Sequence, residues 1–409
     1  MKIAIAKSQA KPETQLAITG SKSETNRLLL LHAFYPQLSI VNVSASDDSE
    51  AMQHALASTS DVIDIHHAGT AMRFLTAYFA LQQGRTVTLT GSERMQQRPI
   101  GILVDALREL GADIEYVNEI GYPPVKIVGK KLTFSKVTLE AGVSSQFISA
   151  LLLIAPKLEN GLELTLSGTI TSVPYIKMTL ALLAEIGIDA SFEDNRITVK
   201  PAVSELQPLN VVVESDWSSA SYFYSMVALS DLGTAIELSS YKSDSLQGDR
   251  ALVEFYRSFG VETFFSENTI RIVKTQSHKP SVVFDLNHTP DIAQTIAVTC
   301  FGLGMSCELL GLHTLKIKET DRLEALRKEL SKFGADISIT DDSLSLKPSA
   351  FIHANVAVDT YNDHRMAMAF APLGLCTSLV INDAGVVTKS FPSFWEDMLQ
   401  VGLEVKILK

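Results

Sequence analysis

The chain repeats itself weakly at intervals of about 72 residues, and this period limits the folds open to it. An apolar strand that ends in a small turn residue recurs, and its final residues are spaced by 71, 77, 72, 71 and 72 positions. The copies are Leu16–Gly20, Val87–Gly91, Leu164–Gly168, Ile236–Ser240, Glu308–Gly311 and Val380–Asp383. Thin solenoids repeat every ~20–50 residues, so each copy here marks a larger unit.

A second marker supports the same period. An apolar helix end, a glycine and a strand follow one another five times, at Gly111, Gly187, Gly260, Gly334 and Gly402. Glycine suits the left-handed position that ends many helices. No copy is found in the first unit. A unit of this length holds roughly two helices and three or four strands, so the markers predict an α/β protein of six repeats, three in each of two domains.

The length of 409 residues also exceeds what one ordinary hydrophobic core holds. We expect one domain at 20–214 and a second made of 1–19 plus 215–409, so that the chain crosses between them twice. The crossings, near 19–20 and 213–216, would form a hinge. A cleft between domains is a favoured place for a ligand.

Composition excludes several classes of protein. The net charge of −11 argues against a nucleic-acid or anionic-membrane partner, which would favour a basic face. No apolar run is long enough to span a membrane, and the first residues do not read as a signal peptide, so we expect a cytoplasmic protein. Cys300, Cys307 and Cys376 lie in apolar runs and are expected to be buried thiols. No spacing suggests a metal site.

Cations recur where helices are expected to begin. In Gly20–Arg27 a strand turns into a helix, and Lys22 and Arg27 lie at that turn. Similar segments are Ala68–Arg73, Lys318–Arg322, Tyr361–Arg365 and Thr388–Ser390. Acidic residues normally complement a helix start, so repeated cations there indicate a ligand with several anionic groups. Each of them alone reads equally well as a surface residue.

Two acids lie among these cations. Asp291 follows His288-Thr289-Pro290, and Glu319 lies between Lys318 and Arg322. Asp291 could act only as an acid in a first helical turn that Pro290 opens, and Glu319 could pair only with its neighbours. Alternatively, carboxylates held beside Lys22 could transfer protons.

Taken together, the motifs resemble those of the 5-enolpyruvylshikimate-3-phosphate synthase family. They occur in the family's order between about residues 16 and 397 and read GSKSETNR, AGTAMR, ERMQQRPIG, SSQF, SVPY, SDWSSASYF, SLQGD, NHTPDIA, KIKETDRL, YNDHRMAM and TKSFPSFW. The resemblance implies two inside-out α/β domains, each of three βαβαββ repeats. It also implies transfer of the enolpyruvyl group of phosphoenolpyruvate to the 5-hydroxyl of shikimate 3-phosphate, a step of the shikimate pathway to chorismate, with no metal or organic cofactor.

The resemblance assigns roles to individual residues. Phosphoenolpyruvate would be bound by Lys22, Gly69, Arg98, Gln146, Arg322, Arg365 and Lys389. Shikimate 3-phosphate would be bound by Lys22, Ser23, Arg27, Ser144, Ser145, Gln146, Ser172, Tyr175, Asp291 and Lys318. Lys22, Asp291 and Glu319 would be the proton-transfer residues.

Some residues depart from the family pattern. His67 stands where an Asn is usual, Phe74 where many members have Pro, and Thr314 where many have an Asn that touches shikimate 3-phosphate. The first two put sensitivity to glyphosate in doubt. Two other readings stay open: the sister enzyme that uses UDP-N-acetylglucosamine, and a non-catalytic binder of phosphorylated metabolites. We expect a monomer.

Overall fold

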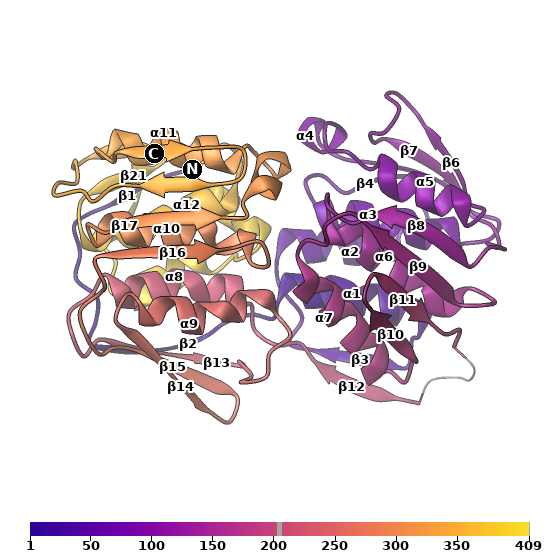
Figure 1. Cartoon of the computed structure of the whole chain (residues 1–409), viewed down its shortest axis with the longest axis horizontal. Helices are drawn as coiled ribbons and strands as arrows, with labels where there is room; N and C mark the ends of the chain where they lie inside the picture. Colours follow the sequence, from indigo (N-terminus) through magenta and orange to yellow (C-terminus); the bar gives the residue numbers. More distant parts are fainter. Residues whose placement is uncertain (203–206, 409) are drawn as a thin grey trace. The chain divides into compact units, whose positions relative to one another are not determined.

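The computed structural model describes residues 1–202 and 207–408 and divides the chain into two compact units (Figure 1). The central unit is Ser21–Val213, and the terminal unit joins Met1–Gly20 to Glu214–Lys409. Gly20 and Glu214, which the sequence placed in the first domain, thus group with the terminal unit.

The central unit contains three sheets and seven helices among its described residues. The sheet orders are β4-β5-β7-β6, β10-β11-β9-β8 and β12-β3. The strands are β3 (Leu38–Val41), β4 (Val62–Asp64), β5 (Thr86–Thr90), β6 (Asp113–Tyr116), β7 (Val125–Val128), β8 (Lys136–Glu140), β9 (Leu162–Ser167), β10 (Ala190–Glu193), β11 (Arg196–Val199) and β12 (Leu209–Val212). The helices are α1 (Lys22–Phe34), α2 (Asp47–Ala57), α3 (Gly69–Ala80), α4 (Glu93–Gln96), α5 (Gly101–Glu109), α6 (Ser145–Ile154) and α7 (Val173–Glu185).

The terminal unit repeats this plan. Its sheet orders are β14-β15-β13-β2, β16-β17-β19-β18 and β20-β21-β1-β22. The strands are β1 (Lys2–Ile5), β2 (Glu13–Ala17), β13 (Ala235–Ser239), β14 (Val261–Ser266), β15 (Thr269–Lys274), β16 (Ser281–Asp285), β17 (Ser306–Leu310), β18 (Ile337–Ile339), β19 (Leu344–Leu346), β20 (Val356–Val358), β21 (Leu379–Ile381) and β22 (Val405–Leu408). The helices are α8 (Trp217–Ala228), α9 (Leu252–Arg257), α10 (Ala293–Gly302), α11 (Arg322–Lys332), α12 (His364–Phe370) and α13 (Phe394–Gln400).

The five four-stranded sheets share one pairing pattern. In the sheet of β8, for example, β8 runs parallel to β9, while β9 and β11, and then β11 and β10, pair antiparallel. Among residues 1–202 and 207–408, the sheet of β3 and β12 has only the parallel pair. In this described part of the chain, the first repeat therefore lacks the antiparallel strands of the other five, which explains why no helix-ending glycine marks it.

The first strand marker in the sequence was misaligned. β2, which contains Leu16, lies at the edge of its sheet, whereas the other five markers fall on β5, β9, β13, β17 and β21, each of which lies next to the parallel edge strand of its sheet. Its true counterpart is β3, which is followed by Asn42 at φ 60°. An apolar run shows that a strand is present but not which place in the sheet it takes.

Two strands are exchanged between the repeats. β2 precedes α1 in the chain but pairs in parallel with β13 of the terminal unit, and β12 precedes α8 but pairs in parallel with β3 of the central unit. The chain therefore passes between the units twice, once after Gly20 and once after Val213. Next to these passages, Gly20 forms a β-bridge with Ser215.

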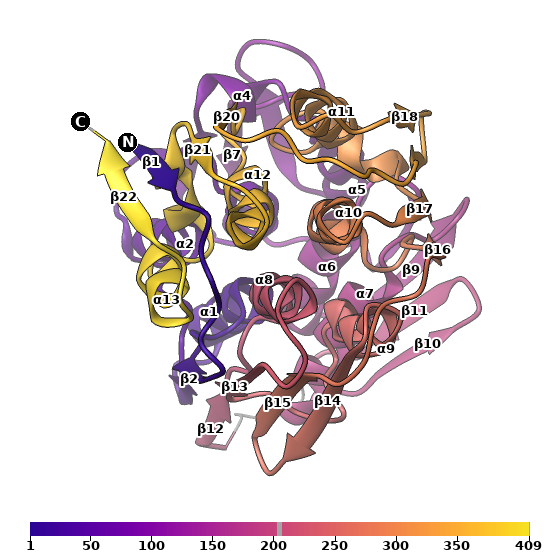
Figure 2. The ribbon, with the colours of Figure 1, turned by 90° about the vertical axis from the view of Figure 1, so that its left-hand side faces the viewer.

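Helices rather than sheets fill the middle of each unit. Figure 2 shows α8, α10 and α12 enclosed by the strands of the terminal unit, and α10 packs against both of the other two. In the central unit α1, α3 and α6 contact one another. Every residue of α3 and of α12 is buried, as expected of helices that pack on all sides.

The predicted helix ends are confirmed. The five glycines of the second marker all have positive φ, between 78° and 113°. Four of them directly follow the C-cap residue of a helix, as Gly111 follows Leu110 and Gly334 follows Phe333. Gly260 lies two residues after Ser258, the C-cap of α9.

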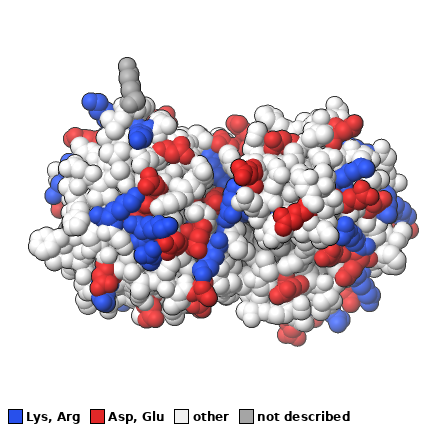
Figure 3. Space-filling view, turned by 90° about the horizontal axis from the view of Figure 1, so that it is seen from above, with Lys and Arg blue, Asp and Glu red and all other residues white. Residues whose placement is uncertain are grey.

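Surface charge is mixed rather than segregated on the face that Figure 3 draws. On the face drawn in Figure 3, basic and acidic side chains are interspersed over both units. Among the described residues, no helix has the length and apolar character to cross a bilayer.

Candidate active site

Arg322 is the centre of a charged cluster in the terminal unit. Its Nε lies 2.7 Å from Oδ2 of Asp363, its Nη1 3.0 Å from Oδ1 of Asp291 and its Nη2 2.8 Å from Oε2 of Glu319. The guanidinium is thus shared by three carboxylates, and the residue is only 2% exposed. Burial alone would lower the pKa of Arg322, but Asp363, Glu319 and Asp291 together raise it.

Three further cations complete the cluster. Nζ of Lys389 lies 2.7 Å from Oε1 of Glu319. Asp291 is 3.6 Å from Nζ of Lys318 and 3.1 Å from Nη2 of Arg365. We call the seven residues the acid–base cluster: Asp291, Lys318, Glu319, Arg322, Asp363, Arg365 and Lys389.

Asp291 is held as an anion by this arrangement. Burial alone would raise its pKa, but Arg365, Lys318 and Arg322 outweigh that effect and hold the pKa well below its ordinary value. A carboxylate with so low a pKa is a weak base until its cations turn to another anion.

Helix caps bring the cluster together. Asp321 accepts a hydrogen bond from the Glu324 N–H and opens α11, so Arg322 is its first residue. Asp363 accepts from the Arg365 N–H and opens α12 in the same way. Asp291 lies in a 3₁₀ turn, Pro290–Ile292, just before α10. The predicted cations at helix starts are therefore confirmed for Arg322 and Arg365, and the side chains meet because α10 packs against α11 and α12. Lys389 instead ends a 3₁₀ segment, Ala384–Lys389, and Lys318 directly follows another, His313–Ile317.

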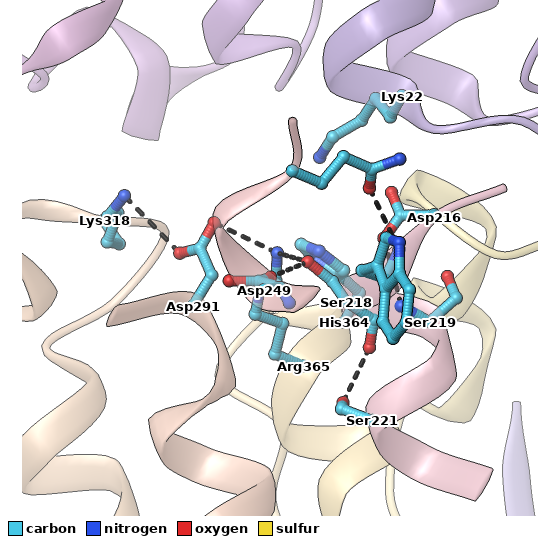
Figure 4. Close-up of polar contacts among 12 residues, drawn as sticks. Lys22, Asp216, Ser218, Ser219, Ser221, Asp249, Asp291, Lys318, His364 and Arg365 are labelled. Carbon is cyan, nitrogen blue, oxygen red and sulfur yellow. Dashed lines mark hydrogen bonds and ion pairs between the residues drawn. The ribbon is translucent and has the colours of Figure 1, made fainter. Parts of the chain in front are cut away.

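A chain of hydrogen bonds extends the cluster toward α8. Arg365 Nη2 lies 3.3 Å from Oγ of Ser218, which donates to Oδ2 of Asp249 (Figure 4). Asp249 is buried, and burial together with the nearby Asp291 raises its pKa to about 7. Asp249 ends the motif SLQGD, but neither Asp249 nor Asp363 was predicted as a site residue. Neither has a spacing signal, because their partners are distant in sequence.

In the central unit, Lys22 begins α1 as predicted, with Ser21 as the cap. Its Nζ lies 3.3 Å from Oδ2 of Asp48, which is 3% exposed on its side chain. Asp48 lies in the first turn of α2. Sequence reasoning missed it because acids in a first turn are ordinary helix-start residues.

The guanidinium of Arg98 lies against the start of α3. A Cβ atom on Gly69 would lie 2.6 Å from Nη1 of Arg98, so the absence of a side chain lets the guanidinium approach the helix. Arg98 is 8% exposed, and its Nε has no hydrogen-bond partner among the described residues. Nearby, Nε2 of Gln146 donates to Oγ1 of Thr70 at 3.1 Å. The structure thus brings together Gly69 and Arg98 and, through Thr70, Gln146.

The guanidinium of Arg27 forms hydrogen bonds with other residues of the central unit. Its Nε donates to Oγ1 of Thr179 at 2.8 Å and its Nη2 to Oγ of Ser149 at 2.9 Å. Its Nη1 donates to the carbonyl of Ser23 at 2.7 Å, and Nη2 also reaches the carbonyl of Tyr175. Burial lowers the pKa of Arg27 to about 10. Arg27 therefore joins α1 to α6 and α7, whatever ligand it also contacts.

The predicted serines lie at helix starts. Ser144 caps α6 by accepting from the Gln146 N–H at 3.3 Å, and Ser145 is the first residue of the helix. Ser172 precedes α7 with the left-handed φ of 53°. Exposed N–H groups at such ends attract phosphate.

The three residues that depart from the family pattern are one exposed residue and two buried residues. His67 lies 3.8 Å from Asp47 near the surface. Phe74 is fully buried, and the Arg27 guanidinium lies over its ring at 5.4 Å. Thr314 is buried, and its Oγ1 has no hydrogen-bond partner among the described residues.

The cysteines do not form a metal site. Cys300 and Cys307 are buried as predicted, whereas Cys376, at the end of a short 3₁₀ segment, is half-buried. Within residues 1–202 and 207–408, no group of three His, Cys, Asp or Glu side chains is placed to hold a metal ion.

Comparison with known proteins places the chain in a family. A family model described as EPSP synthase (3-phosphoshikimate 1-carboxyvinyltransferase) matches residues 52–398. A Bacteroides fragilis protein named 3-phosphoshikimate 1-carboxyvinyltransferase is 45% identical over 407 residues, 98% of each chain. A Colwellia psychrerythraea protein of the same name is 36% identical over 419 residues, 95% of this chain and 96% of its own.

Solved structures share the fold. EPSP synthase from Acinetobacter baumannii matches with a TM-score of 0.80 at 21% identity and covers 99% of this chain and 100% of its own. The fold expected from the resemblance, a mixed α/β protein of this family, is therefore confirmed. Sequence relatives over nearly the full length and a matching family model show that the chain belongs to the EPSP synthase (3-phosphoshikimate 1-carboxyvinyltransferase) family.

Proposed function

We propose that this chain transfers the enolpyruvyl group of phosphoenolpyruvate to the 5-hydroxyl of shikimate 3-phosphate and releases phosphate. The observation that carries the proposal is the acid–base cluster, in which Arg322 is shared by Asp291, Glu319 and Asp363. A binder of phosphorylated metabolites needs the cations of the cluster but not its acids. The family assignment favours this reaction over transfer to UDP-N-acetylglucosamine.

We assign the phosphoenolpyruvate anion to the cations that the cluster already holds. Arg322, Arg365 and Lys389 present guanidinium and ammonium groups that suit a carboxylate and a phosphate. Lys22, Arg98 and Gln146 of the central unit take part, and Gly69 leaves room for Arg98. The unpartnered Nε of Arg98 supports its role, because a buried donor without a partner is costly unless a ligand satisfies it.

We assign shikimate 3-phosphate to a second set of residues. The phosphate is proposed to lie at the helix starts of Ser144, Ser145 and Ser172, with Tyr175 and Gln146 beside it. Lys22, Ser23, Arg27, Asp291 and Lys318 are proposed to contact its hydroxyls and carboxylate. Arg27 is the weakest member of this set, because four protein groups already engage its guanidinium.

The reaction needs an acid and a base at different atoms. Addition forms a bond between C2 of phosphoenolpyruvate and the 5-oxygen, while C3 gains a proton and the hydroxyl loses one. Elimination then breaks the C2–phosphate bond, and C3 gives up a proton. Lys22, Asp291 and Glu319 are proposed to carry these protons, and the cations stabilise the departing phosphate.

Substrate binding would itself change the proton affinity of the carboxylates. When Arg322, Arg365 and Lys389 turn toward the substrate anions, Asp291 and Glu319 lose part of their cationic environment. The proton affinity of both carboxylates would then rise. The cluster is thus arranged so that its carboxylates become proton acceptors when substrate is present.

Several expectations remain predictions. These are a cytoplasmic location, a monomeric state, the absence of any required cofactor and the hinge near 19–20 and 213–216. The β-bridge between Gly20 and Ser215 supports the hinge, because it holds the two chain passages next to each other.

Phosphate release tests the proposed reaction. The enzyme is incubated with phosphoenolpyruvate and shikimate 3-phosphate, and in a parallel assay with phosphoenolpyruvate and UDP-N-acetylglucosamine. Release with the first acceptor only is expected. Release with the second only, or with neither, would overturn the proposal.

A further inference from the structure

We propose that Tyr361 and Glu329 are positioning residues, which hold the turn that presents Asp363 and Arg365 to the substrate. This inference rests on the proposed function of the acid–base cluster. Tyr361 belongs to the motif around Arg365, and its hydroxyl donates to Glu329 rather than to a member of the cluster. Their effect on the reaction would pass through the backbone.

The turn between β20 and α12 has an unusual backbone. Tyr361 and Asn362 both have left-handed φ values, 54° and 56°, and the Asp363 N–H donates to the carbonyl of Thr360 at 2.8 Å. Two successive positive φ values inside such a hydrogen bond are the pattern of a type I′ turn. Asn tolerates this conformation, but a bulky Tyr is a genuine outlier there.

A buried carboxylate compensates for this strain. Oε1 of Glu329 accepts from the Tyr361 hydroxyl at 2.6 Å, and Oε2 accepts from the Asp359 N–H at 3.0 Å. Glu329 itself is fully buried. Lys332 adds bonds to Oε2 of Glu329 at 2.7 Å and to Oδ2 of Asp359 at 2.8 Å. Strained backbone persists only where its surroundings over-determine it, and here a single carboxylate binds both the residue before the turn, Asp359, and the first central residue of the turn, Tyr361.

One face of α11 holds the whole turn. Glu329 follows Arg322 by seven residues, which is two helical turns and therefore the same face. Arg322 binds the side chain of Asp363 at one end of the turn, and Glu329 binds Tyr361 and Asp359 nearer the other. If the turn relaxes, Asp363 moves relative to Arg322. Arg365, whose N–H donates to Asp363, moves with it.

Two tyrosine-to-phenylalanine variants test the proposal. Tyr361→Phe removes only the hydroxyl that reaches Glu329. Tyr224→Phe is the matched control, because the Tyr224 hydroxyl also makes a 2.6 Å hydrogen bond within the same unit, to Thr263 of β14, which is not part of the cluster. Both variants lose one hydrogen bond of 2.6 Å. Because the hydroxyl of Tyr361 donates to a carboxylate, Tyr361→Phe is expected to lower the melting temperature at least as much as Tyr224→Phe does. Tyr361→Phe is expected to raise the KM for phosphoenolpyruvate about tenfold, whereas Tyr224→Phe leaves it unchanged.

Glu329→Gln and a double variant make the test stricter. Because the two residues act as one unit, the double variant Glu329→Gln/Tyr361→Phe should raise the KM no further than the worse single variant does. Equal KM values for Tyr361→Phe, Tyr224→Phe and the wild type would overturn the proposal. Additive effects in the double variant would do the same.

A readout without substrate separates this inference from the proposed reaction. Hydrogen exchange at residues 359–365 should be faster in Tyr361→Phe than in Tyr224→Phe, because the turn loses its anchor. Equal exchange would overturn the inference even if the enzyme is active. A wild-type chain that releases no phosphate would overturn the proposed reaction, and the exchange data would still decide whether Tyr361 holds the turn.

Discussion

Arg322 places its Nη1 atom 3.0 Å from Oδ1 of Asp291, although the two residues lie 31 positions apart. The pair joins the start of α11 to the turn before α10. It has an electrostatic consequence as well as a structural one, because Arg322, with Arg365 and Lys318, keeps the pKa of Asp291 low. A change at Arg322 should therefore alter both stability and the proton chemistry assigned to Asp291.

Arg322→Lys should show that three directed contacts matter more than one charge. Lysine cannot present the planar fork that reaches three carboxylates. We expect kcat/KM to fall by about a hundredfold or more and the free energy of unfolding to fall by roughly 2 kcal/mol. Steady-state kinetics and denaturant unfolding measure the two effects. The control is Arg327→Lys on the same helix, since the partner of Arg327 among the described residues is Glu324, near the surface. Equal kinetics in both variants would refute the central role of Arg322.

Glu319→Gln should separate proton transfer from binding. The amide keeps the shape of the side chain, but it cannot act as an acid or base, and its contact with Lys389 is no longer an ion pair. We expect kcat to fall by about 10²–10⁴-fold, with a smaller change in the KM for shikimate 3-phosphate. Glu324→Gln, on the outer side of the α11 start, should keep normal turnover. A kcat for Glu319→Gln within a few-fold of wild type would exclude Glu319 as a proton-transfer residue.

The sequence predicted the architecture well where local chemistry sets it. Glycine tolerates positive φ, so Gly111 and Gly334 marked helix ends correctly. Sheet membership could not be read in the same way. β2 and β12 exchange places, and nothing in Leu16 or Val211 shows which partner strand each will meet. Strand pairing depends on contacts distant in sequence, which a local pattern does not contain.

The lack of long-range information in a local pattern also explains why only some residues of the candidate site could be predicted. Cations at helix starts could be found because they oppose the helix dipole, and Lys22 and Arg322 both begin helices. Their acidic partners could not, because Asp48 and Asp363 lie where acids are common at helix starts. Asp249 could not be predicted from the sequence for another reason. Its role depends on its burial and on Ser218 from a different helix.

Gly69→Ala should weaken phosphoenolpyruvate binding with little loss of fold. The added Cβ would lie 2.6 Å from Nη1 of Arg98, the far end of a flexible side chain, so the guanidinium would shift rather than the helix. We expect the KM for phosphoenolpyruvate to rise by about tenfold or more and the melting temperature to stay nearly constant. Gly385→Ala is the control, since a Cβ there meets no atom within 4 Å. An unchanged KM in Gly69→Ala would argue against the proposed role of Arg98.

Asp249→Asn should change how stability depends on pH. Burial, with Asp291 nearby, raises the pKa of Asp249 from 3.8 to about 7 in the folded chain. Between these values the folded protein binds a proton that the unfolded chain has released, so the contribution of Asp249 to stability falls as pH rises from about 4 to 7. Asparagine does not titrate and can still accept the hydrogen bond from Ser218.

Denaturant unfolding of both proteins between pH 4 and 8 measures this difference. Asp249→Asn should gain stability relative to wild type as pH rises, by an amount on the order of 2–4 kcal/mol at pH 8. Asp244→Asn, at an exposed position in the loop before Asp249, should show only a small difference at every pH. If the gap between Asp249→Asn and wild type stays constant with pH, the folded protein does not hold a proton on Asp249. The negative charge would then already be present beside Ser218 and Arg365 throughout the range in which the enzyme is assayed.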